Sequence, residues 1–270
     1  MPHNYGILSL ENWKGDVPMN VIVFDTETTD VSKWKFCYNV GWVVYDPVAD
    51  VRLVKRDFVV EQIWHNTELF ATAYYATKRP IYIKAMRARQ TIMDKWGYIM
   101  QTMMRDIKKY EVQCAYAYNS PFDDAVFTFN CDWFKTQNPF DNLPIYDLVG
   151  LATQFITNTN EYRAFCEEHE CFTDAENYSV SAETVYKFLT HNPDFVEAHT
   201  ALADAEIEAD ILRAAFLKGA MIDMEYSKQM PKRKVLKPFK VMVDGVVVAQ
   251  GKYVRKWSKK DDIRFVTENA

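Results

Sequence analysis

The stretch that decides the fold is residues 21–29, Val21-Ile22-Val23-Phe24-Asp25-Thr26-Glu27-Thr28-Thr29. Its first four residues are apolar, and a short apolar run bounded by polar residues predicts a buried strand. Side chains along a strand alternate between its faces, so Asp25 and Glu27 project to the same side. Two carboxylates held together at the end of a buried strand repel each other unless a cation lies between them. Mg²⁺ and Mn²⁺ prefer such oxygen ligands, although a solvated turn explains the two acids equally well.

The composition predicts a folded protein of a reducing compartment. Of the 270 residues, 49% are hydrophobic and 15% aromatic, enough for one large domain with or without an appendage. The five cysteines show no Cys-x-x-Cys spacing, which disfavours a disulfide framework and a zinc site. No apolar run approaches the roughly 20 residues of a membrane helix, and the N-terminal residues contain no signal-peptide core. We therefore expect a soluble, cytoplasmic protein without a membrane partner.

The pattern around the first strand predicts an α/β fold. Residues 36–45 and 51–60 follow as strands joined by a short turn, which indicates an antiparallel meander. Apolar residues then recur three and four apart across residues 66–109, a spacing typical of helices. The other expected elements are an irregular arm at residues 1–19, a strand at 112–118, and helices opening at Asn119, at 178–189 and at 199–217.

The last fifty residues differ in charge from the rest of the chain. Residues 221–270 contain twelve Lys or Arg and six Asp or Glu, whereas the whole chain has a formal net charge of -5. Within this tail, Asp244-Gly245 separates two apolar runs, the strongest short-range signal for a β-hairpin. We therefore expect a main domain at residues 1–220 and a basic C-terminal extension at residues 221–270. The extension would contact nucleic acid or a partner protein, or would be a solvated surface.

Asp123 and the pair His199 and Asp204 are further candidates for a site. Asp123 follows a strand and opens a helix, so it would lie at the carboxyl end of that strand, where the sites of α/β proteins form. The same segment also predicts a helix N-terminus with a capping box, and both interpretations can hold together. His199 precedes Asp204 by five residues at the start of a late helix. His169 and Asp174 share this spacing in a segment without a helical pattern, so we prefer His199.

In chain order, these residues form the motifs Asp-x-Glu after a strand, Asn-x-x-Phe-Asp opening a helix, and His-x4-Asp opening a late helix. The pattern resembles the DnaQ-like 3′-5′ exonucleases of the DEDDh subgroup, over roughly residues 21–218. Asn119 and Phe122 match the amide and aromatic positions of the family. Asp147 resembles an acidic segment that the family carries between its second and third motifs. Asp30 departs from the family pattern, which typically has a Gly at that place.

The resemblance implies a ribonuclease-H-like fold, in which helices flank a central mixed sheet. It also implies that two Mg²⁺ or Mn²⁺ ions bind at the acidic motifs and that His199 is the general base. The implied metal ligands are Asp25, Glu27, Asp123 and Asp204. The implied contacts to the terminal nucleotide are Thr26, Thr28, Asn119 and Phe122. For Phe122, stacking on a base and a place in the core are both open.

The function implied is a metal-dependent 3′-5′ exonuclease acting on DNA, with single strands favoured. A 3′-5′ exoribonuclease or oligonucleotide nuclease is an alternative, because no residue can be shown to read a 2′-hydroxyl. A proofreading subunit that binds a polymerase or another replication protein is a second alternative. The third is a nucleic-acid-binding module without catalysis, against which the complete set of four carboxylates and His199 argues.

Overall fold

The computed structural model describes residues 20–31, 35–221, 224–230, 233, 236–243, 246–254 and 264–266. The expected N-terminal arm and the Asp244-Gly245 turn lie outside these residues. No helix in the described ranges is long and apolar enough to cross a membrane.

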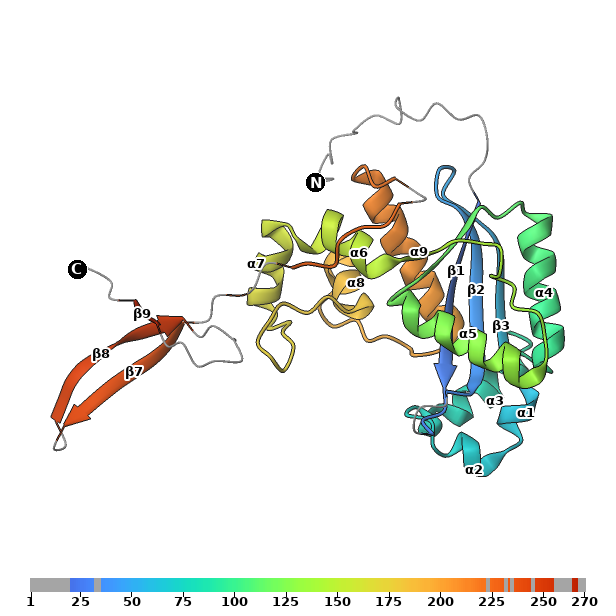
Figure 1. Ribbon diagram of the computed structural model, residues 1–270, viewed down its shortest axis with the longest axis horizontal. Helices are drawn as coiled ribbons and strands as arrows, with labels where there is room; N and C mark the ends of the chain where they lie inside the picture. Colours follow the sequence, from blue (N-terminus) through green and yellow to red (C-terminus); the bar gives the residue numbers. More distant parts are fainter. Residues whose placement is uncertain are drawn as a thin grey trace.

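A six-stranded sheet forms the centre of the main domain (Figure 1). Its strand order is β4-β3-β2-β1-β5-β6. β2 pairs antiparallel with β1 and β3, whereas the other three pairings are parallel. The predicted α/β class with a mixed sheet and an antiparallel meander is therefore confirmed. The strands are β1 (Val21–Thr28), β2 (Cys37–Asp46), β3 (Val51–Val60), β4 (Ile92–Asp94), β5 (Cys114–Ala117) and β6 (Ile145–Asp147).

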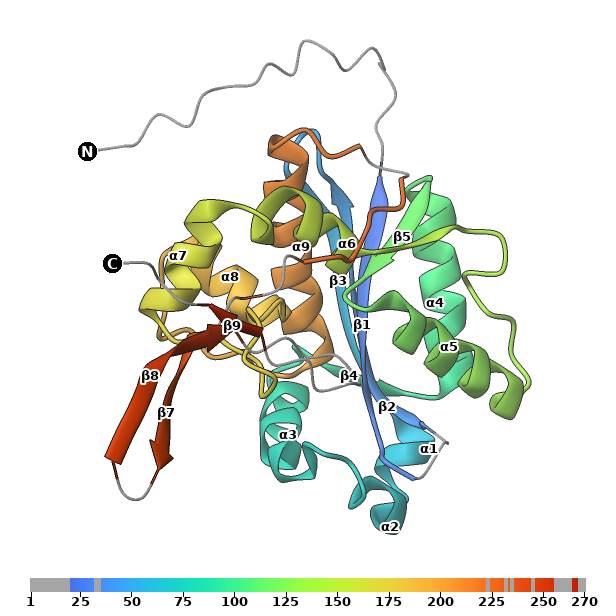
Figure 2. The ribbon, with the colours of Figure 1, turned by 60° about the vertical axis from the view of Figure 1, so that its left-hand side comes forward.

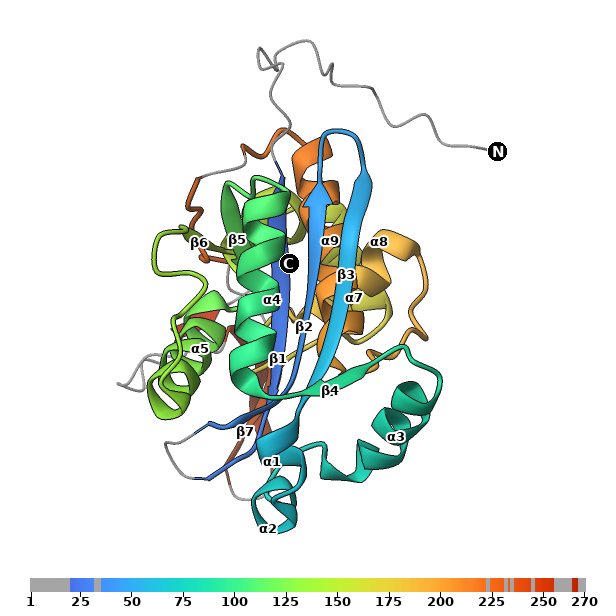
Figure 3. The ribbon, with the colours of Figure 1, turned by 90° about the vertical axis from the view of Figure 1, so that its right-hand side faces the viewer.

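Helices cover both faces of this sheet (Figure 3). One hydrophobic core lies between the sheet and α4 and α5, and the other lies between the sheet and α6, α8 and α9. The helices are α1 (Glu61–Trp64), α2 (Thr67–Phe70), η2 (Ala76–Lys78), α3 (Arg79–Arg87), α4 (Trp96–Lys109), α5 (Ser120–Phe134), α6 (Leu148–Ala152), η3 (Thr153–Thr157), α7 (Asn160–Glu168), α8 (Ala182–Thr190) and α9 (Ala201–Leu217).

The side chains of β1 alternate between the two cores, and this alternation determines the direction in which its two acids point. Ile22 and Phe24 belong to the core on the α4 and α5 side, whereas Val21 and Val23 belong to the core on the α9 side. Alternation continues along the strand, so Asp25 and Glu27 project toward α9. The strand thus delivers two carboxylates to the N-terminal end of a helix that carries a third.

The region predicted to be helical, residues 66–109, is mainly helical, and it contains one strand that was not predicted. Helices α2, η2, α3 and α4 occupy it, and the strand β4 separates α3 from α4. Ile92 lies in β4, where it pairs in parallel register with Phe58 of β3. Apolar spacing cannot reveal this strand, because its backbone hydrogen bonds go to a partner more than thirty residues away.

Two helices, α8 and α9, begin later than predicted, whereas α5 begins where it was predicted. α8 begins at Ala182, because the Ser181 hydroxyl accepts a hydrogen bond from the Thr184 amide at 3.2 Å. α9 begins at Ala201, and His199 lies outside it with a φ of 50°, in the left-handed region. The helix N-terminus predicted at Ser120, Pro121 and Asp123 is confirmed, and the residue before it, Asn119, is left-handed and makes no side-chain cap.

Gly41 and Asn39 of β2 fix the start of α9 against the sheet. The Asn39 side-chain oxygen accepts a hydrogen bond from the Ala201 amide at 2.8 Å. A Cβ on Gly41 would lie 2.5 Å from the Leu202 Cα, so the helix backbone rests directly on the glycine. Gly41 also pairs with Asp25 in the sheet. The close approach therefore brings the first turn of α9 next to the acids of β1.

We predict that Gly41→Ala disturbs both stability and the site. The added methyl overlaps with backbone that cannot move without shifting Asp204, so the free energy of unfolding should fall by about 1–3 kcal/mol or more. Urea unfolding measures this loss, and the hydrolytic rate should fall with it. Gly97→Ala is the matched control, because its Cβ meets only a methyl of Thr136 at 3.5 Å. Equal stability of the two variants would contradict the packing argument.

The chain beyond Gly219 packs on the main domain before it reaches the C-terminal sheet. A Cβ on Gly150 of α6 would overlap with the backbone of Tyr226, and Lys228 forms an ion pair with Asp147. Arg233 binds Glu167 of α7 through two hydrogen bonds of 2.8 and 2.7 Å. The boundary at residue 220 stays a prediction, and any truncation that tests it should end after Arg233.

The predicted C-terminal hairpin is confirmed. β7 (Leu236–Val243) pairs antiparallel with β8 (Val246–Val254), and the register brings Val243 opposite Val246. β7 begins earlier than the apolar run indicates. A third strand, β9 (Arg264–Val266), pairs with β8 and was not predicted.

Candidate active site

Three of the predicted carboxylates converge at the end of β1. Side-chain oxygens of Asp25, Glu27 and Asp204 all lie within 4.8 Å of one another. One Asp204 oxygen, Oδ1, is buried and has no hydrogen-bond partner among the described residues. An unpaired buried carboxylate oxygen is costly, whereas a cation ligand of this kind is satisfied when the ion is present. The donor set therefore fits a hard divalent cation such as Mg²⁺ or Mn²⁺.

Asp123 approaches the same place from α5. Its Oδ1 accepts a hydrogen bond of 2.6 Å from the Thr26 hydroxyl, and the side chain is buried. Burial raises its pKa well above the ordinary range, and the charge of Asp25 raises it further. Asp123 is thus electrostatically coupled to Asp25 without belonging to the close group of three.

The acids of the site hold protons more tightly than free carboxylic acids do. Burial, followed by the charge of Glu197, raises the pKa of Asp25 to about 7. Burial and the charges of Asp25 and Asp204 raise the pKa of Glu27 to about 10. Burial and Asp25 raise the pKa of Asp204 to about 9. A cation would reverse these shifts, because it stabilises the charged form that burial penalises.

His199 belongs to a second group, in which a ring nitrogen and side-chain oxygens of Glu183 and Glu197 lie within 4.8 Å of one another. Its ring stacks on Tyr75, with the ring centroids 4.4 Å apart and the planes inclined by 13°. Its Nδ1 lies 3.6 Å from Oε2 of Glu197. Burial, and then the charge of Lys78, lowers the pKa of His199. The imidazole is therefore neutral at physiological pH, which is the form that can accept a proton.

Sequence reasoning missed two further acids. Glu208 is buried one turn beyond Asp204 in α9, and it accepts a hydrogen bond of 3.2 Å from the Tyr118 amide. Its spacing of four residues from Asp204 is the signal that could have indicated it. Glu197 lies on the loop before α9, and its amide donates to Glu183 at 3.1 Å. No sequence pattern marks Glu197, because a loop brings it to His199.

The four residues expected to contact a substrate differ in their exposure and in their hydrogen-bond partners. Phe122 is 40% exposed, so its predicted alternative place in the core is wrong. Thr26 is buried and engages Asp123, whereas Thr28 is half-buried opposite Cys37 of β2. The backbone N–H of Asn119 donates a hydrogen bond of 3.1 Å to Asp147, and Asp147 also caps α6. Asp147 is thus bound by structural partners, including Lys228.

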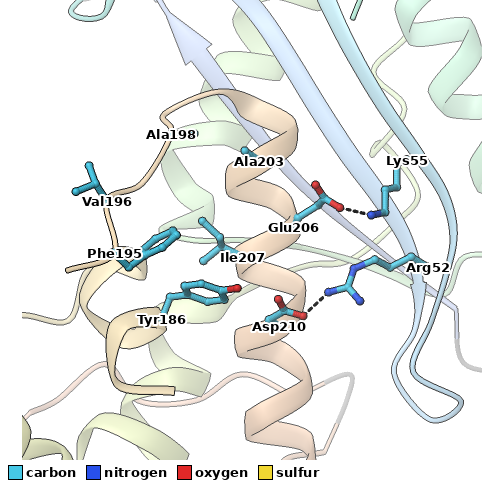
Figure 4. Close-up of a pocket in the computed structure, with 10 residues that line it drawn as sticks. All are labelled: Arg52, Lys55, Tyr186, Phe195, Val196, Ala198, Ala203, Glu206, Ile207 and Asp210. Atoms are coloured by element: carbon cyan, nitrogen blue, oxygen red, sulfur yellow. Dashed lines mark hydrogen bonds and ion pairs between the residues drawn. The ribbon is translucent and has the colours of Figure 1, made fainter. Parts of the chain in front are cut away.

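A hollow of about 380 Å³ lies between α8, α9, β3 and the loop that joins α8 to α9, which contains His199 and is called the His199 loop (Figure 4). Its lining includes Tyr186 and Phe195, whose rings pack against each other. Its two cations are already paired, Arg52 with Asp210 and Lys55 with Glu206. The carboxylates of the site do not line it. It is therefore separate from the acidic cluster and offers no unpaired cation for an anion.

The raised pKa values predict that pH and metal act together on stability. Asp25, Glu27 and Asp204 bind protons in the folded protein at a pH where the unfolded chain has lost them. Without metal, each should therefore destabilise the fold as pH rises toward its folded pKa, by about 1.4 kcal/mol per pH unit for each extra proton bound. Thermal unfolding in EDTA should show falling stability between pH 6 and 9, which excess Mg²⁺ or Mn²⁺ removes.

Asp204→Asn is the matched variant for this titration. It should weaken the pH dependence in EDTA, because the amide of Asn does not ionise. Parallel curves with and without metal across this range would contradict the assignment of these acids to a cation site.

No family model matches this sequence, and no curated protein does. The chain is similar to the solved nuclease domain of 3′hExo, a DEDDh family member, bound to rAMP. The two are 10% identical, the match covers 76% of this chain and 94% of that chain, and the TM-score is 0.49. The conclusions about the fold and the site therefore depend on the strand order and the carboxylates of this chain, and not on that similarity.

Proposed function

We propose that this protein is a metal-dependent nuclease that removes nucleotides from the 3′ end of DNA, with single strands preferred. The observation that carries the proposal is the convergence of Asp25, Glu27 and Asp204, with an unpartnered buried oxygen on Asp204. Carboxylates that are forced together and lack other partners are suited to hard cations. Cations at such a site activate water and stabilise the leaving oxygen in phosphodiester hydrolysis.

The protein's own residues then have distinct roles. Asp25, Glu27 and Asp204 would hold two ions together with Asp123, which Thr26 orients. Neutral His199 would accept the proton of the attacking water, and Glu197 would stabilise the imidazolium that forms, since it faces Nδ1. The exposed ring of Phe122, next to Asp123, would stack on the terminal base. The backbone amides near Thr26 and Thr28, and Asn119, would lie beside the terminal sugar.

An experiment distinguishes a preference for DNA from a preference for RNA. Parallel digestion of 5′-labelled DNA and RNA of one sequence should shorten DNA faster. A reversed preference would make the protein an exoribonuclease or oligonucleotide nuclease and leave the cation site intact. A protein with the cation-dependent stability described above but no hydrolysis of either strand would be a binding module. The basic tail, and with it a polymerase or other replication partner, stays a prediction without an observation to favour it.

A further inference from the structure

Residues 71–91, which we name the basic segment, are basic in a chain that is acidic overall. The segment contains Lys78, Arg79, Lys84, Arg87 and Arg89 and no Asp or Glu, in a chain with a net charge of -5. It includes η2 and α3 and lies at the same end of the molecule as the start of α9 (Figure 2). The charge of this segment is by itself what a solvated helix face would show. A functional role must therefore be argued from the contacts that the segment makes.

The N-terminal part of the basic segment forms one wall of the candidate site. Tyr75 stacks on His199, and the Lys78 ammonium donates a hydrogen bond of 2.5 Å to the carbonyl of Ala198. The charge of Lys78 also lowers the pKa of both Glu27 and Asp204, against the larger effect of their burial. A chain end bound at the carboxylates would therefore leave the site alongside this segment.

The outer part of the basic segment offers cations that have no acidic partner. Lys84, Arg87 and Arg89 are exposed, and within the described residues none of them forms an ion pair. Lys84 and Arg87 are three residues apart in α3 and so share a face. This differs from the hollow behind the His199 loop, where acids neutralise both cations.

The basic segment also contains an exposed aromatic ring. Tyr74 is 84% exposed and packs edge-on against Tyr75, with the ring centroids 4.8 Å apart. Tyr74 is thus held next to the ring that stacks on His199, with its other face toward solvent. Unpaired cations with an exposed aromatic ring are the combination that binds single-stranded nucleic acid, through phosphate contacts and base stacking.

We propose that the basic segment binds the single strand on the 5′ side of the terminal nucleotide. Lys84, Arg87 and Arg89 would contact phosphates, and Tyr74 would stack on a base. The inference rests on the proposed function, because it takes the substrate to be a nucleic-acid strand. Nucleic acid is a polyanion, and the carboxylates of the site repel it. The basic segment would attract the strand and so offset this repulsion.

The test compares two triple variants in the full chain, each also carrying Asp25→Asn to prevent hydrolysis. One carries Lys84→Gln, Arg87→Gln and Arg89→Gln. The matched control carries Arg105→Gln, Lys108→Gln and Lys109→Gln, which removes the same charge from an exposed face of α4. Affinity for a labelled 12-nucleotide DNA strand is measured by fluorescence anisotropy across a salt series.

The basic-segment variant should bind at least 10-fold more weakly at low salt. Its salt slope should be shallower by about 2, since each of three phosphate contacts contributes about 0.7. Tyr74→Ala should weaken binding roughly 5- to 150-fold with an unchanged salt slope, because stacking releases no counterions. Equal affinities of the two triple variants would overturn the proposal, whether both are unchanged or both are weakened, because the effect would then be one of net charge.

A second measurement separates this proposal from the proposed function. Hydrolysis of the p-nitrophenyl ester of thymidine 5′-monophosphate, without the Asp25→Asn background, reports on the acidic site alone. The basic-segment variant should retain the ester rate within about twofold while losing activity on the long strand. A wild-type protein that hydrolyses neither substrate would defeat the proposed function, and the anisotropy series would still decide whether the basic segment binds DNA. An equal loss on ester and strand would overturn the strand-binding role.

Discussion

Asp25→Asn should reduce hydrolysis of a labelled DNA strand to background without unfolding the protein. The substitution removes a carboxylate charge from the group of three acids, on which the proposed two-ion catalysis would depend. The same change removes a repulsive buried charge, so the variant should unfold at a higher temperature than wild type in EDTA at pH 8. End-labelled digestion measures the rate, and circular dichroism measures the folding.

Asp124→Asn is the matched control for this prediction. Asp124 is adjacent to Asp123 but exposed, so its loss should leave the rate unchanged. A wild-type rate for Asp25→Asn, or full activity of the wild type in EDTA, would remove the cation site from the explanation.

His199→Ala should lower the rate by about 10²- to 10⁴-fold, the usual contribution of a general base. His199 is expected to accept a proton and not to hold a cation, so stabilisation of the variant by Mg²⁺ or Mn²⁺ should persist. The comparison requires both readouts, the hydrolytic rate and the metal-induced shift in unfolding temperature.

His169→Ala is the control for the base. His169 ends α7 and packs on Phe165, and it lies on no element of the candidate site. Its loss should change neither readout. If His199→Ala cleaved as fast as wild type at neutral pH, another group would have to take the proton.

The sequence allowed prediction of the acidic motifs because their positions depend on local rules. The alternation of β1 places Asp25 and Glu27 on one face, and the turn from β5 into α5 delivers Asp123 to the same end of the sheet. The hairpin of β7 and β8 was likewise indicated by a local turn signal. Each of these predictions needs only a few neighbouring residues.

The parts that escaped prediction depend on contacts between distant residues. Asn39 and Gly41 set the start of α9 from more than 150 positions away, so the helix begins two residues later than its pattern indicates. Tyr75 contacts His199 although the two are far apart in the sequence, and Glu197 reaches His199 from an irregular loop. No periodicity records such contacts. The environment of His199 could therefore be found only in three dimensions.

The measurement that tests the central claim most directly is digestion of a 5′-labelled single DNA strand with Mg²⁺, with Mn²⁺ and with EDTA. The proposed function predicts products that shorten one nucleotide at a time from the 3′ end when either metal is present. It predicts no cleavage in EDTA, and none by Asp25→Asn under any of the three conditions. Cleavage that persists in EDTA, or shortening that begins at the 5′ end or inside the strand, would contradict it.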